Sequence, residues 1–118
     1  MELGKFLIKL EKIAGPVHLL MVAGSSAGMQ SLNLIVSAKK FNDIPVSSAI
    51  KQITAALRIH VKSEELNKLS KITVLKSTEP VVRAINSAFH IEGGSIHLQN
   101  CDINGVNIEN AIIYQSKH

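Results

Sequence analysis

The fold is decided by the stretch SIHLQNCDINGVNIENAIIY, residues 95–114. Apolar and polar residues alternate along this stretch, which is typical of strands with one buried face. Asn104-Gly105 lies between the two alternating runs. This dipeptide is the strongest short-range signal for a tight hairpin, because both central residues of a type I′ turn need a positive φ. The sequence therefore predicts a C-terminal β-hairpin.

The same residues resemble a second β architecture. The successive steps CDING, VNIEN and AIIYQ, residues 101–115, are similar to pentapeptide-repeat β-helices. That resemblance implies a solenoid, in which each coil buries its core against neighbouring coils. Three steps are too few to stack in this way, so we favour the hairpin.

The first third of the chain predicts a helix and two strands. Apolar residues recur at helical spacing over residues 3–13, and Gly15-Pro16 ends that helix. The continuous apolar run at 17–23 predicts a central strand. Residues 32–38 are rich in Leu, Ile and Val and predict another strand, with a helix as the open alternative.

The middle of the chain carries further helix and strand signals. We expect a helix capped by Ser47 or Ser48, a short helix starting at Ser63, a strand at 72–75 and a helix capped by Thr78. The predicted order is α-β-β-α-α-β-α-β-β. Helices and strands do not alternate strictly, so we predict one α+β domain over residues 1–118. It consists of a single, mostly antiparallel sheet packed by helices.

Composition and charge narrow the classes of function. The 118 residues are 46% hydrophobic, carry a net charge of +4 and have a pI of about 9.4. The lysines are dispersed, and Arg58 and Arg83 are the only arginines. Because arginine forks and aromatic platforms recognise nucleic acids, this composition speaks against such a partner, and weak nucleic-acid binding remains a second alternative.

The single cysteine, Cys101, excludes an internal disulfide and fits a reducing compartment. Pro16 and His18 interrupt the apolar run near the N-terminus, which argues against a signal peptide. Nowhere does the chain approach the roughly 18 consecutive apolar residues of a transmembrane helix. We therefore expect a cytoplasmic protein without a membrane partner.

One segment carries a possible catalytic motif. Gly24-Ser25-Ser26-Ala27-Gly28 fits the pattern G-x-S-x-G after an apolar strand, a spacing that exposes a serine hydroxyl in hydrolases. Residues 22–28, and more loosely residues 66–69, are similar to the catalytic domain of chemotaxis-receptor methylesterases. The resemblance implies a serine esterase with Ser26 as nucleophile. The family's histidine would fall near Gln52-Ile53, and its acid lies beyond the end of this chain.

The same loop has two simpler interpretations. It is a turn built from small residues, or, if a helix follows it, a binding site in which Ser25, Ser26 and Gly28 cradle an anion on backbone N–H groups. A serine without a base is a weak nucleophile. The serine hydrolase, with His18 or His60 as the base, is therefore the alternative hypothesis.

Potential metal ligands gather near the hairpin at His90, Glu92, His97 and Cys101. On an extended strand His97 and Cys101 share a face but lie roughly 13 Å apart, too far to bind one ion. We therefore expect no metal and no cofactor. Cys101 is interpreted as a small core residue.

The hairpin also suggests an interaction surface. Ile112 and Ile113 are consecutive, so in a regular strand they point to opposite faces, and a helix or a second subunit must cover the second face. The sequence thus favours a non-enzymatic interaction or ligand-binding domain that self-associates through its hairpin, with Ile112, Ile113 and Tyr114 at the interface. A protein or small-molecule partner is compatible with the same pattern.

Overall fold

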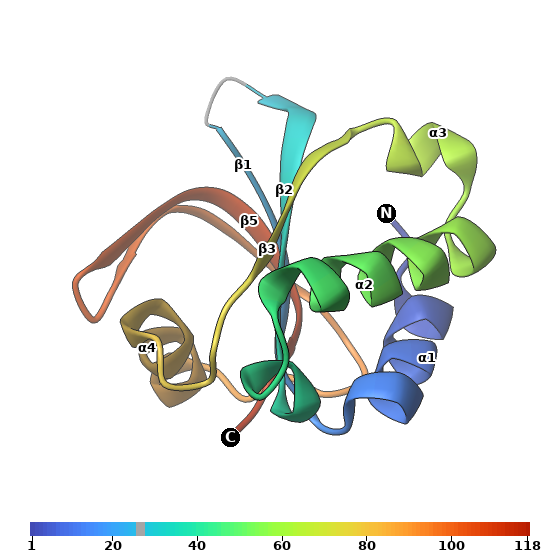
Figure 1. The fold of residues 1–118 in the computed structure, drawn as a ribbon. Coiled ribbons are helices and arrows are strands. Elements are labelled where there is room, and N and C mark those ends of the chain that lie inside the picture. The colour runs from blue at the N-terminus through green and yellow to red at the C-terminus, as the bar shows by residue number, and fades with distance from the viewer. Residues whose placement is uncertain (26–27) are drawn as a thin grey trace.

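The computed structural model describes the backbone of residues 1–25 and 28–118 and the side chains of residues 1–24 and 31–118. The chain forms an α+β fold around one five-stranded sheet (Figure 1). Its elements are α1 (Gly4–Ala14), β1 (Val17–Ser25), β2 (Gly28–Ala38), the 3-10 helix η1 (Lys39–Asn42), α2 (Val46–His60), α3 (Ser63–Leu66), β3 (Leu69–Val74), α4 (Pro80–Ala88), β4 (Ile96–Ile103) and β5 (Val106–Ser116). The predicted order of helices and strands is confirmed, with η1 as the one addition.

The strands lie in the order β3-β2-β1-β5-β4, which puts β1 at the centre as predicted. β1 pairs antiparallel with both β2 and β5, and β4 pairs antiparallel with β5. β2 and β3 are parallel, because the chain crosses over through α2 and α3 between them. The segment left open between strand and helix is a strand, and it begins at Gly28.

Helices cover both faces of the sheet (Figure 1). On β1, Leu20 and Val22 belong to the core beneath α1 and α2, whereas Leu19 and Met21 belong to the core beneath α4. This division follows from the two-residue period of a strand. The central strand is therefore buried on both faces, which explains its continuous apolar run.

Two helix starts differ from the predicted caps. α2 begins at Val46, directly after Pro45, so Ser47 and Ser48 lie inside its first turn. α4 begins at Pro80 after Glu79, and Thr78 lies outside the helix. Pro80 occupies the first helical position, which proline favours because its missing N–H has no partner there and its φ is already helical, whereas Pro45 precedes α2 as its N-cap residue. Neither N-cap position makes a side-chain capping bond.

The membrane expectation can be compared with the described helices. None of the helices in residues 1–25 and 28–118 is long and apolar enough to cross a membrane.

Candidate functional site

The C-terminal hairpin forms as predicted. Asn104 and Gly105 have φ values of 48° and 88°, the pair of positive angles that a type I′ turn requires. The hairpin extends beyond the end of β1 and curves over α4 (Figure 1). At its tip, the amide nitrogen of Asn104 donates a hydrogen bond to the carbonyl oxygen of Ala84 in α4, 3.2 Å away.

This curvature buries the apolar face of the hairpin within the chain. The residues that line it are Leu98, Ile103, Ile108, Ala111 and Ile113, all at most 8% exposed. They pack with Val82 and Ile85 of α4. The helix therefore covers this face of the hairpin.

The three predicted interface residues have different surroundings. Ile113 is fully buried in the α4 core. Tyr114 is half-buried on the other face, where its hydroxyl donates a hydrogen bond to the carbonyl oxygen of Met1, 2.8 Å away. Burial raises the pKa of Tyr114, and the nearby carboxylates of Glu65 and Glu2 add to this effect. Ile112 is half-buried and points away from the α4 core.

The outer edge of the hairpin is formed by β4. Within the described part of the chain, β5 is the only strand that pairs with β4. The two-residue loop makes Ile103 and Val106 a hydrogen-bonded pair. Along β4, residues whose backbone groups bond to β5 alternate with residues whose backbone groups point away from it. The N–H and C=O groups of Ile96 and Leu98 therefore point toward the open side. Asn100, with a φ of 50°, interrupts the extended backbone and limits the regular edge to residues 96–99.

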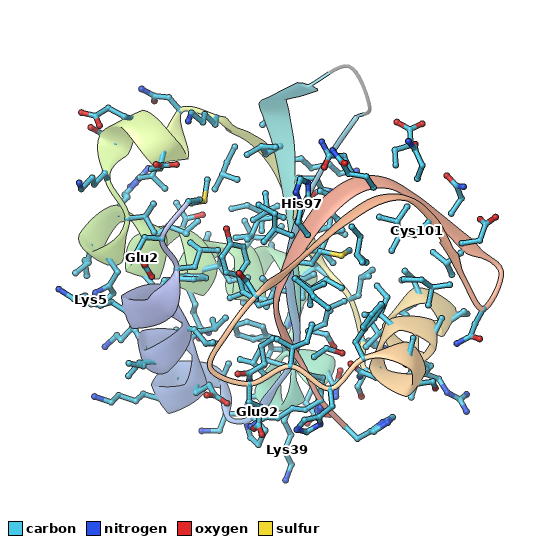
Figure 2. The ribbon with its side chains drawn as sticks, turned by 180° about the vertical axis from the view of Figure 1, so that it is seen from behind. Glu2, Lys5, Lys39, Glu92, His97 and Cys101 are labelled. Carbon is cyan, nitrogen blue, oxygen red and sulfur yellow. The ribbon has the colours of Figure 1, made fainter. Side chains whose placement is uncertain are left out.

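His97 and Cys101 do not share a site. His97 Nε2 lies 2.6 Å from Oδ1 of Asn110 on β5, and the Cys101 thiol donates to the carbonyl oxygen of Gln99. Figure 2 shows the two side chains at separate places along the hairpin. No group of three His, Cys, Asp or Glu side chains that could hold a metal ion occurs among the residues that the structure describes.

The segment 24–28 joins two strands. β1 ends with Ser25, β2 begins at Gly28, and these two residues pair. Ser26, the candidate nucleophile, lies outside the described residues. The serine turn of hydrolases leads from a strand into a helix, and so does an anion cradle at a helix N-terminus, whereas here a strand begins at Gly28.

The histidines proposed as bases for that serine lie elsewhere. His18 is near the start of β1, six residues from Gly24, which corresponds to roughly 20 Å along a strand. His60 is the last residue of α2 and lines a hollow with Lys5 and Ile8 of α1. The histidine nearest to the end of β1 is His97, since its partner Asn110 pairs with Gly24.

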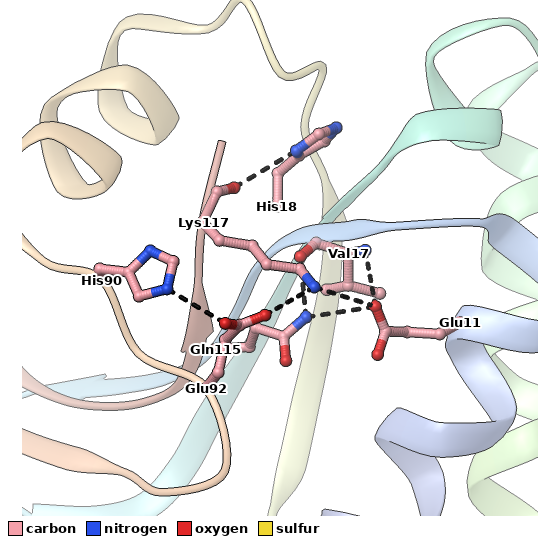
Figure 3. Close-up of polar contacts among 7 residues, drawn as sticks. All are labelled: Glu11, Val17, His18, His90, Glu92, Gln115 and Lys117. Atoms are coloured by element: carbon pink, nitrogen blue, oxygen red, sulfur yellow. Dashed lines mark hydrogen bonds and ion pairs between the residues drawn. The ribbon is translucent and has the colours of Figure 1, made fainter.

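A polar network at the opposite end of the sheet was not predicted (Figure 3). Lys117 Nζ lies 2.8 Å from Oε1 of Glu92 and 3.8 Å from Oε2 of Glu11, and His90 Nε2 lies 3.1 Å from Oε2 of Glu92. The amide nitrogen of Gln115 donates to the carbonyl oxygen of Val17 at 2.9 Å. The residues of this network come from α1, β1, the α4–β4 connection and the end of β5, so no local sequence pattern could have identified the network.

The charges of this network compensate one another. The hydrogen bond from Lys117, followed by that from His90, lowers the pKa of Glu92 below its ordinary value. The bond to Glu92 raises the pKa of Lys117, and the charge of Glu11 acts in the same direction. The network therefore connects the C-terminal strand to α1, and its contacts stabilise the fold.

Comparison with known proteins gave no relative: no family model, no curated protein and no solved structure matches this chain.

Proposed function

We propose that this chain is a non-enzymatic interaction domain that forms a homodimer through the β4 edge of its C-terminal hairpin. The observation that carries the proposal is the chemistry of that edge. β4 presents unpaired backbone groups, and its eight residues include neither lysine nor arginine. Proteins commonly protect exposed edge strands with lysine, and β4 lacks this protection.

The other edge of the sheet provides the contrast. Lys68 precedes β3, Lys71 lies within it and Lys76 follows it, and all three are exposed. Two copies of such an edge would bring like charges together. Of the two edges, β4 is therefore the one suited to pairing with itself.

A two-fold axis beside β4 would join two sheets into one. Residues 96–99 of each copy would pair antiparallel, because an isologous interface places the same strand on both sides of the axis. Ile112 lies one strand inward, paired with His97, and would flank the seam on the face that α4 does not cover. Because the regular edge covers only residues 96–99, the interface is small, and we expect a weak dimer that forms as the protein concentration increases.

Light scattering over a range of protein concentrations tests the proposal. Wild-type protein is expected to shift from monomer to dimer mass. Gln99→Lys, at an exposed position of β4, is expected to hold the protein as a monomer, because a lysine on an edge strand opposes strand pairing. Gln52→Lys makes the same change on the exposed side of α2 and should dimerise like the wild type.

Two results would contradict the proposal. One is a monomer at every concentration up to about 1 mM, the weak end of specific association. The other is a dimer that Gln99→Lys leaves unchanged, because this would place the interface elsewhere. Circular dichroism of both variants shows whether the fold is retained.

A further inference from the structure

The second open edge of the sheet lies beside a groove. α2 packs over the face of β3, and between them is a hollow of about 420 Å³. Its apolar walls are Ile50 and Leu57 of α2, Leu66 of α3, and Leu69 and Ile72 of β3. Four of these five side chains are only partly buried, so the groove exposes apolar surface along the sheet edge.

The backbone of β3 presents hydrogen-bonding groups on the same side. Leu75 donates its N–H to the carbonyl oxygen of Val36 on β2. Successive residues of a strand direct their backbone groups to opposite sides, so this bond shows which residues of β3 face β2. The N–H and C=O groups of Ile72 and Val74 consequently point away from β2. In the described part of the chain, no strand pairs with that side of β3.

The charge around the groove is positive. Arg58 lines it from α2 and Lys71 from β3, both exposed, and neither forms an ion pair within the described residues. Lys68 is partly neutralised by Glu65, whose carboxylate lies 4.0 Å away. A second copy of this basic edge would be repelled, whereas an acidic strand would be attracted.

We propose that the β3 edge and the α2 groove bind an extended acidic segment of a partner protein as an additional strand. A strand added to β3 would lie roughly 4.8 Å beyond it, over the groove. Because side chains alternate, every second residue of the ligand faces α2 and enters the apolar groove. The intervening residues face the side of the sheet on which Lys71 lies, and acidic side chains suit that position.

The chemistry of the ligand follows from this placement. It is a segment that alternates β-branched apolar residues with aspartate or glutamate and contains no proline at the pairing positions. Main-chain hydrogen bonds to Ile72 and Val74 supply affinity, and the groove with Arg58 and Lys71 supplies selectivity. This inference concerns the edge opposite the proposed dimer seam and does not depend on it.

Fluorescence anisotropy with a labelled Val-Glu-Val-Glu-Val-Glu peptide tests the proposal on the intact chain. The peptide is expected to bind, and its counterpart with lysine in place of glutamate is expected to bind at least about fivefold more weakly. N-methylation of alternate peptide amides should abolish binding, because it removes the donors that pair with β3. That comparison uses wild-type protein and avoids any effect of a substitution on folding.

Two exposed lysines provide matched variants. Lys71→Glu is expected to weaken binding of the acidic peptide about fivefold or more, because the acidic side chains face the side of the sheet on which Lys71 lies, while Lys12→Glu, on the exposed side of α1, should bind like the wild type. The proposal is overturned if the acidic peptide does not bind at about 1 mM. It is equally overturned if the lysine or N-methylated peptide binds as well as the acidic peptide, or if Lys71→Glu has no effect. Peptide binding is measured independently of the dimer mass, so a failure of this proposal can be distinguished from a failure of the dimer proposal.

Discussion

The hydroxyl of Tyr114, on β5, donates a hydrogen bond to the carbonyl oxygen of Met1, 113 positions away in the sequence. This bond fastens the segment before α1 to the central part of the sheet. Tyr114 also packs against the core that α1 and α2 form.

Removing this hydroxyl is expected to destabilise the fold modestly. Tyr114→Phe keeps the ring in the core and deletes only the donor, so we expect a loss of about 1 kcal/mol in the free energy of unfolding. Urea denaturation followed by circular dichroism measures it. An unchanged midpoint would show that water replaces the bond at no cost.

The same tyrosine predicts a pH dependence at the alkaline end. The fold raises the pKa of Tyr114, so its contribution to stability is complete below the ordinary tyrosine pKa and is lost as pH rises through the folded value. Tyr114 is the chain's single tyrosine, so absorbance at alkaline pH reports this group alone. A midpoint at or below the value of a free tyrosine would contradict the burial argument.

Two fully buried serines provide a matched comparison. Ser116 Oγ lies 2.8 Å from Oδ1 of Asn86 and 2.9 Å from the carbonyl oxygen of Phe89. Ser37 Oγ has no hydrogen-bond partner among the described residues. We expect Ser116→Ala to cost about 1–3 kcal/mol, because it leaves buried acceptors unpaired, and Ser37→Ala to be neutral or stabilising. Equal losses in thermal or urea unfolding would contradict this assignment.

How much of this architecture the sequence predicts depends on how local each signal is. Asn104-Gly105 specifies its turn through two adjacent residues, and that hairpin is confirmed. The parallel pairing of β2 with β3 has no local signal, because the two strands pair across an intervening crossover. The predicted caps Ser47, Ser48 and Thr78 were wrong, because α2 begins directly after Pro45 and α4 begins at Pro80.

For the candidate sites, too, the outcome depends on how local the sequence signal is. Alternation correctly puts Ile112 and Ile113 on opposite faces, but it contains no information on what covers each face. α4 covers Ile113 because the hairpin curves over that helix. The network around Lys117 joins side chains up to 106 residues apart, as the bond between Lys117 and Glu11 shows, so only tertiary structure could bring it together.

The turn itself makes a fourth prediction. Gly105 has a φ of 88°, a conformation that a Cβ atom strains, and nothing else lies within 4 Å of the position of that atom. Gly105→Ala is therefore expected to destabilise the protein by about 1 kcal/mol through backbone strain alone. Gly94→Ala is the control, since that position is equally open and has no positive φ. Similar unfolding midpoints for the two variants would contradict the turn geometry.

The Lys117 network makes a fifth prediction, at acid pH. The fold lowers the pKa of Glu92, so the stability this carboxylate contributes is present above the ordinary glutamate pKa and is lost as pH falls through the lowered value. Lys117→Met removes the largest cause of that shift and should move the NMR titration midpoint of the Glu92 carboxyl upward, toward its ordinary value. Lys39→Met, at an exposed lysine that forms no ion pair among the described residues, should leave the midpoint in place. If Lys117→Met also leaves it in place, His90 rather than Lys117 dominates the charge of this network.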